Sequence, residues 1–266
     1  MHNMEGFRMI RFISLISGSS GNAAFLSDGK TNLLIDCGMS GVRLKDALSA
    51  IDVLPDSIDA LLVTHEHIDH VKGAGVISRR YNIPVYATEG THTAMDVGKI
   101  SDENTRLIYS GSEFEIGSIA VTPFTIPHDA RQPVGFTFMV NGEKYALATD
   151  MGTMTNDILN NITGSKKILL ESNLDVEMLR MGSYPFPLKQ RILGNSGHLS
   201  NDIAAKTALY LVQRGTEHIM LGHLSQENNR PEIAMMETYN MLTASGVNVG
   251  SDMTLKVADR YKPTFF

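Results

Sequence analysis

The stretch THEHIDH, at residues 64–70, brings together four side chains of metal-binding type: His65, His67, Asp69 and His70. Side chains two residues apart share a face of an extended segment, so His65 and His67 are expected to hold one metal ion. A turn into a helix would then direct Asp69 and His70 towards a second ion. Imidazole and carboxylate without thiolate suit Zn²⁺, Mn²⁺ or iron, and such a concentration of ligands disfavours the alternative of a solvated polar turn.

Further candidate ligands stand where other apolar runs end. His128 follows TPFTIP, Asp150 follows YALAT, His223 follows IMLG, and Asp36 follows NLLI. Each residue alone would be ordinary in a structural position. Together they supply the ligands that a second metal ion needs. Water that bridges two divalent cations is acidified, so hydroxide is available as a nucleophile near neutral pH. The expected chemistry is hydrolysis of an ester, an amide or a phosphodiester.

The tetrapeptide GHLS occurs twice, at residues 197–200 and 222–225, in different surroundings. His223 in the second copy ends a strand-like run. His198 in the first copy precedes an amphipathic segment that either Ser200 or Asn201 could cap. A histidine just outside a helix N-terminus is well placed to meet a phosphate, so His198 is interpreted as a group for the departing oxygen. The alternative is a polar residue in an ordinary helix cap.

The elements that position these residues alternate along the chain. Runs rich in β-forming residues predict strands, and 3.6-residue periodicity predicts helices. The predicted strands are residues 7–17, 23–27, 31–38, 60–65, 85–88, 114–127, 134–140, 143–150, 166–172, 217–223 and 253–259. The first three are expected to form an antiparallel meander, and the turn Asn141–Gly142 is expected to join 134–140 to 143–150. The predicted helices are residues 41–51, 71–81, 91–100, 154–162, those within 174–193, 202–213 and 231–244. Two blocks of strands with helices between and after them favour two sheets packed face to face, with the helices outside.

Bulk composition limits the class of protein. The chain of 266 residues contains 42% hydrophobic and 20% charged residues, which is consistent with one globular α/β domain over residues 1–266. A net charge of −6 provides no global attraction to nucleic acid. Cys37 is the only cysteine, which excludes an internal disulfide and favours a reducing cytoplasm. The first apolar run is too short for a signal peptide or a membrane span, so no contact with a membrane is expected.

The order and placement of these residues resemble the metallo-β-lactamase fold, whose most specific motif is HxHxDH. The resemblance implies a four-layer αβ/βα sandwich with two divalent metal ions, Zn²⁺ or Mn²⁺, at the rim between its sheets. By the same resemblance, His65, His67 and His128 bind one ion, Asp69, His70 and His223 bind the other, and Asp150 bridges both. Asp36 would orient a ligand histidine without binding metal. Histidine at position 67, where flavodiiron-type relatives carry glutamate, favours hydrolysis.

Residues 171–205 are similar to the catalytic part of the tRNase Z group, in which a strand ends in glutamate and a histidine precedes an alanine-rich helix. This similarity implies that Glu171 hydrogen-bonds His198, and that Asp69, Glu171 and His198 carry the reaction. The stretches FISLISGSSGN, LLIDCGMS, VTHEHIDHVKGAGVISRRY, SNLDVEMLRMGSYPFPLKQRILGNSGHLSN and LGHLSQENNRPE resemble the YycJ (WalJ) family. That family resemblance implies a 5′–3′ exonuclease on double-stranded DNA, linked to DNA mismatch repair.

Two segments are candidates for binding the substrate. The first lies around residues 178–191, where cationic and aromatic side chains alternate, and the second is the turn SGSSGN. The candidate residues are Arg180, Tyr184, Lys189 and Arg191 in the first, and Ser19 and Asn22 in the second. The alternatives are two ordinary helices joined by a proline-containing turn, and a tight turn between strands.

Three other functions are compatible with parts of the sequence. Hydrolysis of a small phosphodiester would use the same site without a polymer channel, and the acidic net charge mildly favours it. Hydrolysis of a thioester, lactone or β-lactam would not need Glu171 and His198 as a pair. A non-catalytic scaffold fits poorly, because every expected ligand position is filled.

Overall fold

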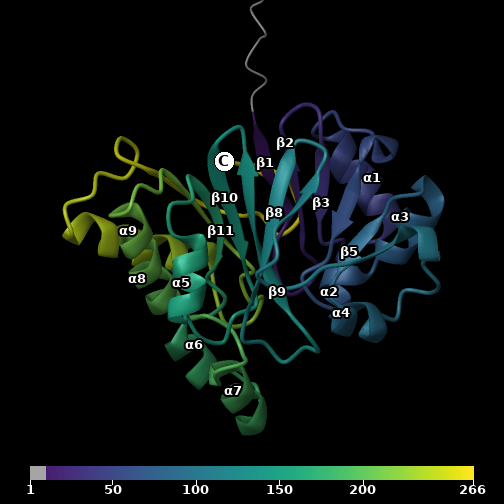
Figure 1. Ribbon diagram of the computed structural model, residues 1–266. Helices are drawn as coiled ribbons and strands as arrows, with labels where there is room; N and C mark the ends of the chain where they lie inside the picture. Colours follow the sequence, from purple (N-terminus) through teal and green to yellow (C-terminus); the bar gives the residue numbers. More distant parts are fainter. Residues whose placement is uncertain (1–9) are drawn as a thin grey trace, which may run out of the picture.

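The structure is a computed structural model that describes residues 10–266. Two sheets pack against each other, and helices cover the outer face of each (Figure 1). The four-layer αβ/βα sandwich that the sequence predicts is therefore confirmed. Residues 7–9 of the first predicted strand lie outside the described residues.

Within residues 10–266, the first sheet consists of seven strands in the order β14-β1-β2-β3-β4-β5-β6. Their bounds are Arg11–Ile16 (β1), Ala23–Ser27 (β2), Asn32–Ile35 (β3), Ala60–Leu62 (β4), Val85–Ala87 (β5), Thr105–Leu107 (β6) and Thr264–Phe265 (β14). Strands β1, β2 and β3 form the expected antiparallel meander, and β3 to β6 run parallel.

The second sheet also has seven strands, in the order β13-β12-β11-β10-β9-β8-β7. They span Phe114–Ile116 (β7), Ile119–Thr125 (β8), Val134–Val140 (β9), Glu143–Ala148 (β10), Lys167–Glu171 (β11), His218–Gly222 (β12) and Thr254–Val257 (β13). Strands β10 to β13 are parallel, whereas β7 to β10 are antiparallel. The predicted turn Asn141–Gly142 joins β9 to β10 with both residues at positive φ, the conformation that Asn-Gly favours in a two-residue hairpin.

The helices divide between the two outer faces. The helices that lie between strands of the first sheet in chain order are α1 (Gly41–Ser49), α2 (Ile68–Val71), α3 (Ala74–Tyr81) and α4 (Glu89–Ala94), together with the short 3₁₀ turns η1 (Pro55–Ser57) and η2 (Asp102–Asn104). The second half contributes α5 (Asn156–Ile162), α6 (Val176–Met181), α7 (Phe186–Leu193), α8 (Asn201–Val212) and α9 (Pro231–Ala244). In Figure 1, α1 and α3 lie outside the first sheet, α5, α8 and α9 outside the second, and α7 projects below them.

Three apolar layers hold this arrangement together. The middle layer lies between the sheets and contains Phe12, Phe136, Phe138 and Tyr145, all almost completely buried. A second layer packs the first sheet against α1 and α3, and a third packs the second sheet against α5, α8 and α9. Because strands of both sheets are covered on two faces, they appear in the sequence as continuous apolar runs rather than as alternating ones.

Some helix boundaries differ from those predicted, and local residues explain the differences. The helix expected at residues 91–100 begins earlier, at Glu89, because the Thr88 side chain accepts a hydrogen bond from Thr91 N and caps it. The helices expected within residues 174–193 are two short ones, and as the sequence allowed they are separated by a proline-containing turn from Gly182 to Pro185. The segment 71–81 is likewise broken near Gly73 into α2 and α3.

The C-terminal residues YKPTFF, to which no role was assigned from the sequence, complete the first sheet. Strand β14 pairs antiparallel with β1, and Thr264 lies opposite Ser14 in this pairing. The Phe266 ring stacks on Phe12 with ring centroids 4.8 Å apart. A two-residue strand is too short to show a period-two pattern, so its pairing could not be read from sequence.

We expect Phe136→Ala to destabilise the fold by about 3–5 kcal/mol, because the substitution opens a cavity in the layer between the sheets. Met139→Ala on the same strand is the matched control, since Met139 is 40% exposed and its loss should cost less than about 1 kcal/mol. Urea unfolding of both variants measures the difference. Equal losses of unfolding free energy in the two variants would contradict the assignment of the stabilising contacts of β9 to the layer between the sheets.

Candidate metal centre and catalytic pocket

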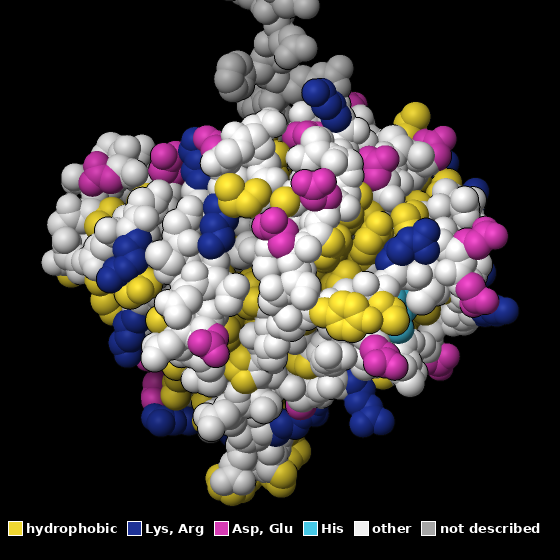
Figure 2. All heavy atoms as spheres, in the orientation of Figure 1, with side chains coloured by type: hydrophobic (Ala, Val, Ile, Leu, Met, Phe, Trp, Pro, Cys, Tyr) yellow, Lys and Arg dark blue, Asp and Glu magenta, His cyan; other side chains and the backbone are white. Residues whose placement is uncertain are grey.

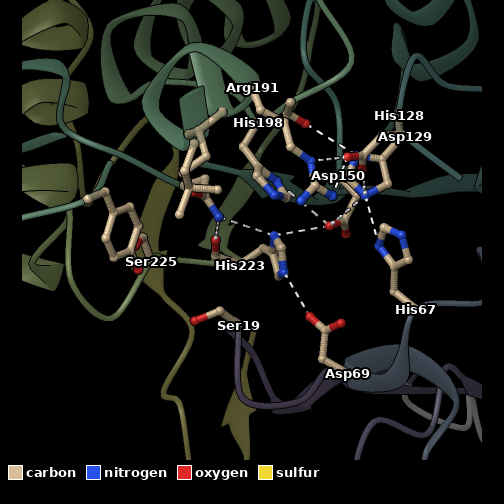
Figure 3. Close-up of a pocket in the computed structure, with 15 residues that line it drawn as sticks. Ser19, His67, Asp69, His128, Asp129, Asp150, Arg191, His198, His223 and Ser225 are labelled. Carbon is tan, nitrogen blue, oxygen red and sulfur yellow. Dashed lines mark hydrogen bonds and ion pairs between the residues drawn. The ribbon is translucent and has the colours of Figure 1, made fainter. Parts of the chain in front are cut away.

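The candidate site lies where strands of both sheets end. Asp36 follows β3, and residues 64–70 follow β4. From the other sheet come His128 after β8, Asp150 after β10, Glu171 at the end of β11 and His223 after β12. The carboxyl ends of parallel strands meet at one edge of a sheet, and here the two edges meet each other. Residues distant in sequence therefore face one pocket (Figure 3).

Backbone contacts hold the THEHIDH loop in place. Asn22 N donates to Asp69 O at 2.8 Å, and Cys37 N donates to His70 O at 2.7 Å. Gly38 lies so close to this loop that an added Cβ would be 1.6 Å from the Asp69 carbonyl oxygen. Only glycine allows this approach. The turn SGSSGN and the segment after β3 therefore act as a clamp on the loop that carries four of the predicted ligands.

The first group of predicted ligands, His65, His67 and His128, comes together with its ligand atoms within 4.8 Å of one another. His128 Nδ1 lies 3.2 Å from the Gly197 carbonyl oxygen. Because a carbonyl can only accept, Nδ1 carries the proton and Nε2 is left with its lone pair. That Nε2 lies 3.3 Å from His67 Nδ1, so these two atoms face the same point.

The second group, Asp69, His70 and His223, also converges. Asp69 Oδ2 lies 3.7 Å from His70 Nε2 and 3.6 Å from His223 Nε2. His70 Nδ1 is 2.8 Å from Asp36 Oδ2, so the carboxylate sets the histidine tautomer and turns Nε2 towards the pocket. Asp36 also accepts hydrogen bonds from Thr64 N and Thr64 Oγ1. Asp36 therefore hydrogen-bonds a predicted ligand histidine and the residue before the first of the predicted ligands.

Asp150 lies between the two groups. Its Oδ2 is 3.3 Å from His70 Nε2, and its Oδ1 is 3.8 Å from His128 Nε2 and 3.3 Å from His223 Nδ1. Its backbone has φ of 62°, in the left-handed region that side chains other than glycine seldom adopt. Asp36 and His223 have similar values, 59° and 55°. Left-handed backbone at three site residues is strain of the kind that accumulates at functional sites.

Buried polar atoms without hydrogen-bond partners show, independently of the sequence motifs, that these residues fit a metal centre. His65 Nε2, Asp150 Oδ2 and His223 Nε2 are buried and make no hydrogen bond within the described residues. Buried polar atoms without partners are costly unless a ligand satisfies them. All three belong to residues of the predicted ligand set, and they offer imidazole nitrogen and carboxylate oxygen, which suit Zn²⁺ or Mn²⁺.

The pKa values of His65 and His70 are shifted in opposite directions by their surroundings. Burial lowers the pKa of His65 well below 6.5, and the neighbouring histidines lower it further, so this imidazole is neutral as a metal ligand must be. Burial also lowers the pKa of His70, but Asp150, Asp36 and Asp69 outweigh it and raise that pKa to about 9. The same carboxylates that attract a proton would attract a divalent cation.

Glu171 is completely buried and holds His198. Glu171 Oε1 lies 2.8 Å from His198 Nδ1 and 3.0 Å from His223 Nδ1. Burial raises the pKa of Glu171, but the charge of His198 and hydrogen bonds from both histidines outweigh it and keep that pKa well below 4.5. With Nδ1 donating to the carboxylate, His198 presents Nε2 to the pocket. Ser200 is the N-cap residue of α8 by backbone geometry, but neither it nor Asn201 forms the predicted side-chain cap.

The pocket has a volume of about 250 Å³, and some but not all of the predicted substrate-binding residues line it. Ser19, Tyr184 and Arg191 line it together with His198 and ligand residues. The structure does not bring Asn22, Arg180 and Lys189 into the pocket. Asn22 is buried, and its Nδ2 lies 3.1 Å from His70 Nε2. Arg180 pairs with Glu177, and Lys189 donates to the carbonyls of Arg180 and Gly182.

Among the pocket residues that the sequence did not single out, Asp129 and Asn173 contact predicted ligands. Asp129 pairs with Arg191 across the pocket and lies 3.5 Å from His128 Nε2. Its position directly after a predicted ligand was the available signal. Asn173 donates from Nδ2 to the His223 carbonyl oxygen at 2.6 Å and thereby holds the backbone of a predicted ligand. Glu66, which lies between two of the predicted ligands, accepts a hydrogen bond from Arg131 N at 2.7 Å.

We expect His223→Ala to lower the bound metal from about two to about one ion per chain, because it removes a donor from the second group. His198→Ala should leave the metal content unchanged, since His198 belongs to neither of the two predicted ligand groups. Elemental analysis of both proteins, with circular dichroism to verify folding, measures this. Retention of two ions by His223→Ala would refute the ligand assignment.

Within the described residues, none of the helices has the length and apolar character needed to cross a membrane. A family model described as "Beta-lactamase superfamily domain" matches residues 31–224. The overall fold is also similar to the crystal structure of the metallo-beta-lactamase fold protein YhfI from Bacillus subtilis. That similarity has a TM-score of 0.69 at 13% identity and covers 97% of this chain and 100% of that one. At this identity the likeness concerns the fold alone.

Two curated relatives match along most of their lengths. The exodeoxyribonuclease WalJ of Streptococcus pneumoniae is 39% identical over 246 residues, which cover 91% of this chain and 91% of that protein. The exodeoxyribonuclease YycJ of Bacillus anthracis is 38% identical over 257 residues, which cover 96% and 97%. The family match, the fold and these similarities agree with the clustered histidines and carboxylates. The chain belongs to the WalJ/YycJ family of the beta-lactamase superfamily and is a metal-dependent hydrolase.

Proposed function

We propose that this protein is a metal-dependent phosphodiesterase and, more narrowly, a 5′–3′ exonuclease that acts on double-stranded DNA. The observation that carries the proposal is the hydrogen bond between the buried Glu171 and the partly exposed His198 beside the metal-ligand groups. An activated ester has a good leaving group and needs little help from an acid, whereas a departing DNA oxygen must be protonated or stabilised. Hydrolysis of a thioester or lactone would not require this pair of residues.

The relatives support DNA as the substrate. The two relatives described above are both named exodeoxyribonucleases. The size of the pocket supports removal from an end, because a cavity of about 250 Å³ lies near the lower limit for small-molecule pockets. A cavity of this size suits a single nucleotide and not a duplex. The terminal nucleotide would therefore leave the helix to enter the pocket.

The protein groups have distinct roles in this proposal. His65, His67 and His128 would hold one divalent ion, Asp69, His70 and His223 another, and Asp150 would contact both. When bound, Zn²⁺ or Mn²⁺ ions lower the pKa of water and neutralise charge on the phosphate. His198 Nε2 delivers a proton to the departing oxygen while Glu171 holds Nδ1. Ser19, Tyr184 and Arg191 stand where they can contact the nucleotide, and Arg191 would exchange Asp129 for phosphate.

A small phosphodiester is the second candidate substrate, and the surface charge favours it. The net charge is −6, and on the face shown in Figure 2 the lysine and arginine side chains are interspersed with acidic ones. Long-range attraction of a polyanion is therefore weak, and any binding to DNA must come from local contacts.

The first test uses linear duplex DNA with 5′-phosphates and a label at either end, incubated with the protein and Mn²⁺ or Zn²⁺. We expect 5′-nucleotides to be released progressively from the 5′ end. Asp69→Ala is the control and should be inactive, because it removes a ligand of the second group. Absence of DNA cleavage with either metal, while a small phosphodiester is hydrolysed, would transfer the assignment to the second candidate.

The role of His198 is tested with two substrates of different leaving-group quality. We expect His198→Ala to reduce the kcat for DNA by about 10²–10⁴-fold, the usual contribution of general acid catalysis. Hydrolysis of bis(p-nitrophenyl) phosphate should fall by less than about tenfold, because nitrophenolate leaves without a proton. Equal losses on both substrates, at unchanged metal content, would rule out the proposed proton transfer.

A further inference from the structure

We propose that a second cleft, adjoining the catalytic pocket, binds the phosphodiester backbone of the nucleotides that follow the one being cleaved. The inference rests on the proposed function and extends it from one nucleotide to a polymer. The cleft has a volume of about 430 Å³ and lies between the segment after β12, the start of α9 and the segment after β13. Ser225 lines both this cleft and the catalytic pocket, where it is seen at the edge in Figure 3.

The cleft offers a cation that is free to bind an anion. Arg230 is exposed, and its side chain makes no hydrogen bond or ion pair with the described residues. Arg180 and Arg191, in contrast, already pair with Glu177 and Asp129. An unpaired guanidinium can bind a phosphate without first giving up a carboxylate, so Arg230 is the better placed of these arginines for a backbone contact.

An aromatic ring stands beside this arginine. Tyr261 is 59% exposed and lines the same cleft, so its ring is available to stack on a base. Asp259 is the one acidic residue among the described residues that line the cleft. Its Oδ1 accepts hydrogen bonds from the backbone nitrogens of Tyr261 and Lys262, at 2.7 and 3.0 Å, which partly compensate its charge. The carboxylate thus shapes the turn that presents Tyr261.

Arg260 links the cleft to the metal centre. Its Nη2 donates to the carbonyl oxygen of Leu224 at 2.8 Å, directly after the predicted ligand His223. Its Nη1 is buried and has no acceptor within the described residues. A Cβ on Gly18 would lie 2.8 Å from that Nη1, so Arg260 also contacts the loop that carries Ser19. Arg260 therefore supports the wall between cleft and pocket and adds positive charge behind it.

These contacts describe a path for one strand. The terminal nucleotide occupies the catalytic pocket, the second nucleotide passes Ser225, and the phosphate and base of the third nucleotide meet Arg230 and Tyr261. A substrate of one or two nucleotides would end before the cleft. The cleft therefore distinguishes a polymer from a small phosphodiester, although both would react at the same metal centre.

The test measures binding separately from hydrolysis. His198→Ala protein with Mn²⁺ is titrated against a 20-nucleotide duplex, 5′-phosphorylated and labelled at its 3′ end, and against a 5′-phosphorylated dinucleotide as competitor. We expect Arg230→Glu to raise the Kd for the duplex about tenfold and Tyr261→Ala to raise it about fivefold, with less than about twofold change for the dinucleotide. Arg230→Ala should reduce the salt dependence, log Kd against log salt concentration, by about 0.7–0.9.

Arg43→Glu is the matched control, because Arg43 is an exposed arginine on α1 and lines neither the pocket nor the cleft. It carries the same change in net charge. If Arg43→Glu weakens binding of the duplex as much as Arg230→Glu, or if both Arg230 variants bind like the parent, the cleft assignment is wrong. Hydrolysis by the otherwise unaltered protein is scored independently. Selective loss of duplex binding by Arg230→Glu supports the cleft even if no nucleotide is released, and that result would refute only the exonuclease activity.

Discussion

The catalytic pocket depends on one buried carboxylate, that of Glu171. Its two oxygens contact four donors: His198 Nδ1, His223 Nδ1, Met151 N and Leu199 N. These donors come from the ends of β10 and β12 and from the segment before α8. A buried charge with this many hydrogen bonds is stable, but removal of one partner would leave the rest uncompensated. The Glu171 side chain therefore positions three groups together: the predicted ligand His223, the backbone of Met151 next to Asp150, and the proposed acid His198.

Asp36 has the corresponding function on the first sheet. It accepts from Thr64 N and Thr64 Oγ1 and holds His70 by its Nδ1. Thr64 Oγ1 in turn lies 3.0 Å from His65 Nδ1. Since the threonine proton goes to the carboxylate, the hydroxyl oxygen is left to accept from His65, which frees His65 Nε2 for a metal. Each sheet thus contributes one buried carboxylate that orients histidines, Asp36 from the first and Glu171 from the second.

The sequence predicted what depends on local pattern and on residue type. Buried strands, the Asn-Gly turn and the seven candidate ligands were recognisable, because apolar runs and clustered histidines are visible in one dimension. Contacts between distant segments were not. Nothing in the sequence indicates that Asp129 pairs with Arg191, that Lys189 is engaged by backbone carbonyls, or that the last residues join β1. The same limit applies to Ser225 and Arg230, whose importance arises from a cleft formed by three segments.

The left-handed backbone at Asp150 and His223, two of the predicted metal ligands, restricts which amino acids these positions can accept. Asparagine, aspartate and histidine are the residues other than glycine that enter this region most readily. Only aspartate and histidine among them are also strong metal ligands, so conformational and chemical requirements select the same two residue types. Glutamate and cysteine would satisfy a metal ion in solution, yet here each would add backbone strain. The variety of metal centres that this framework could evolve, or be engineered to hold, is accordingly narrower than the coordination chemistry alone allows.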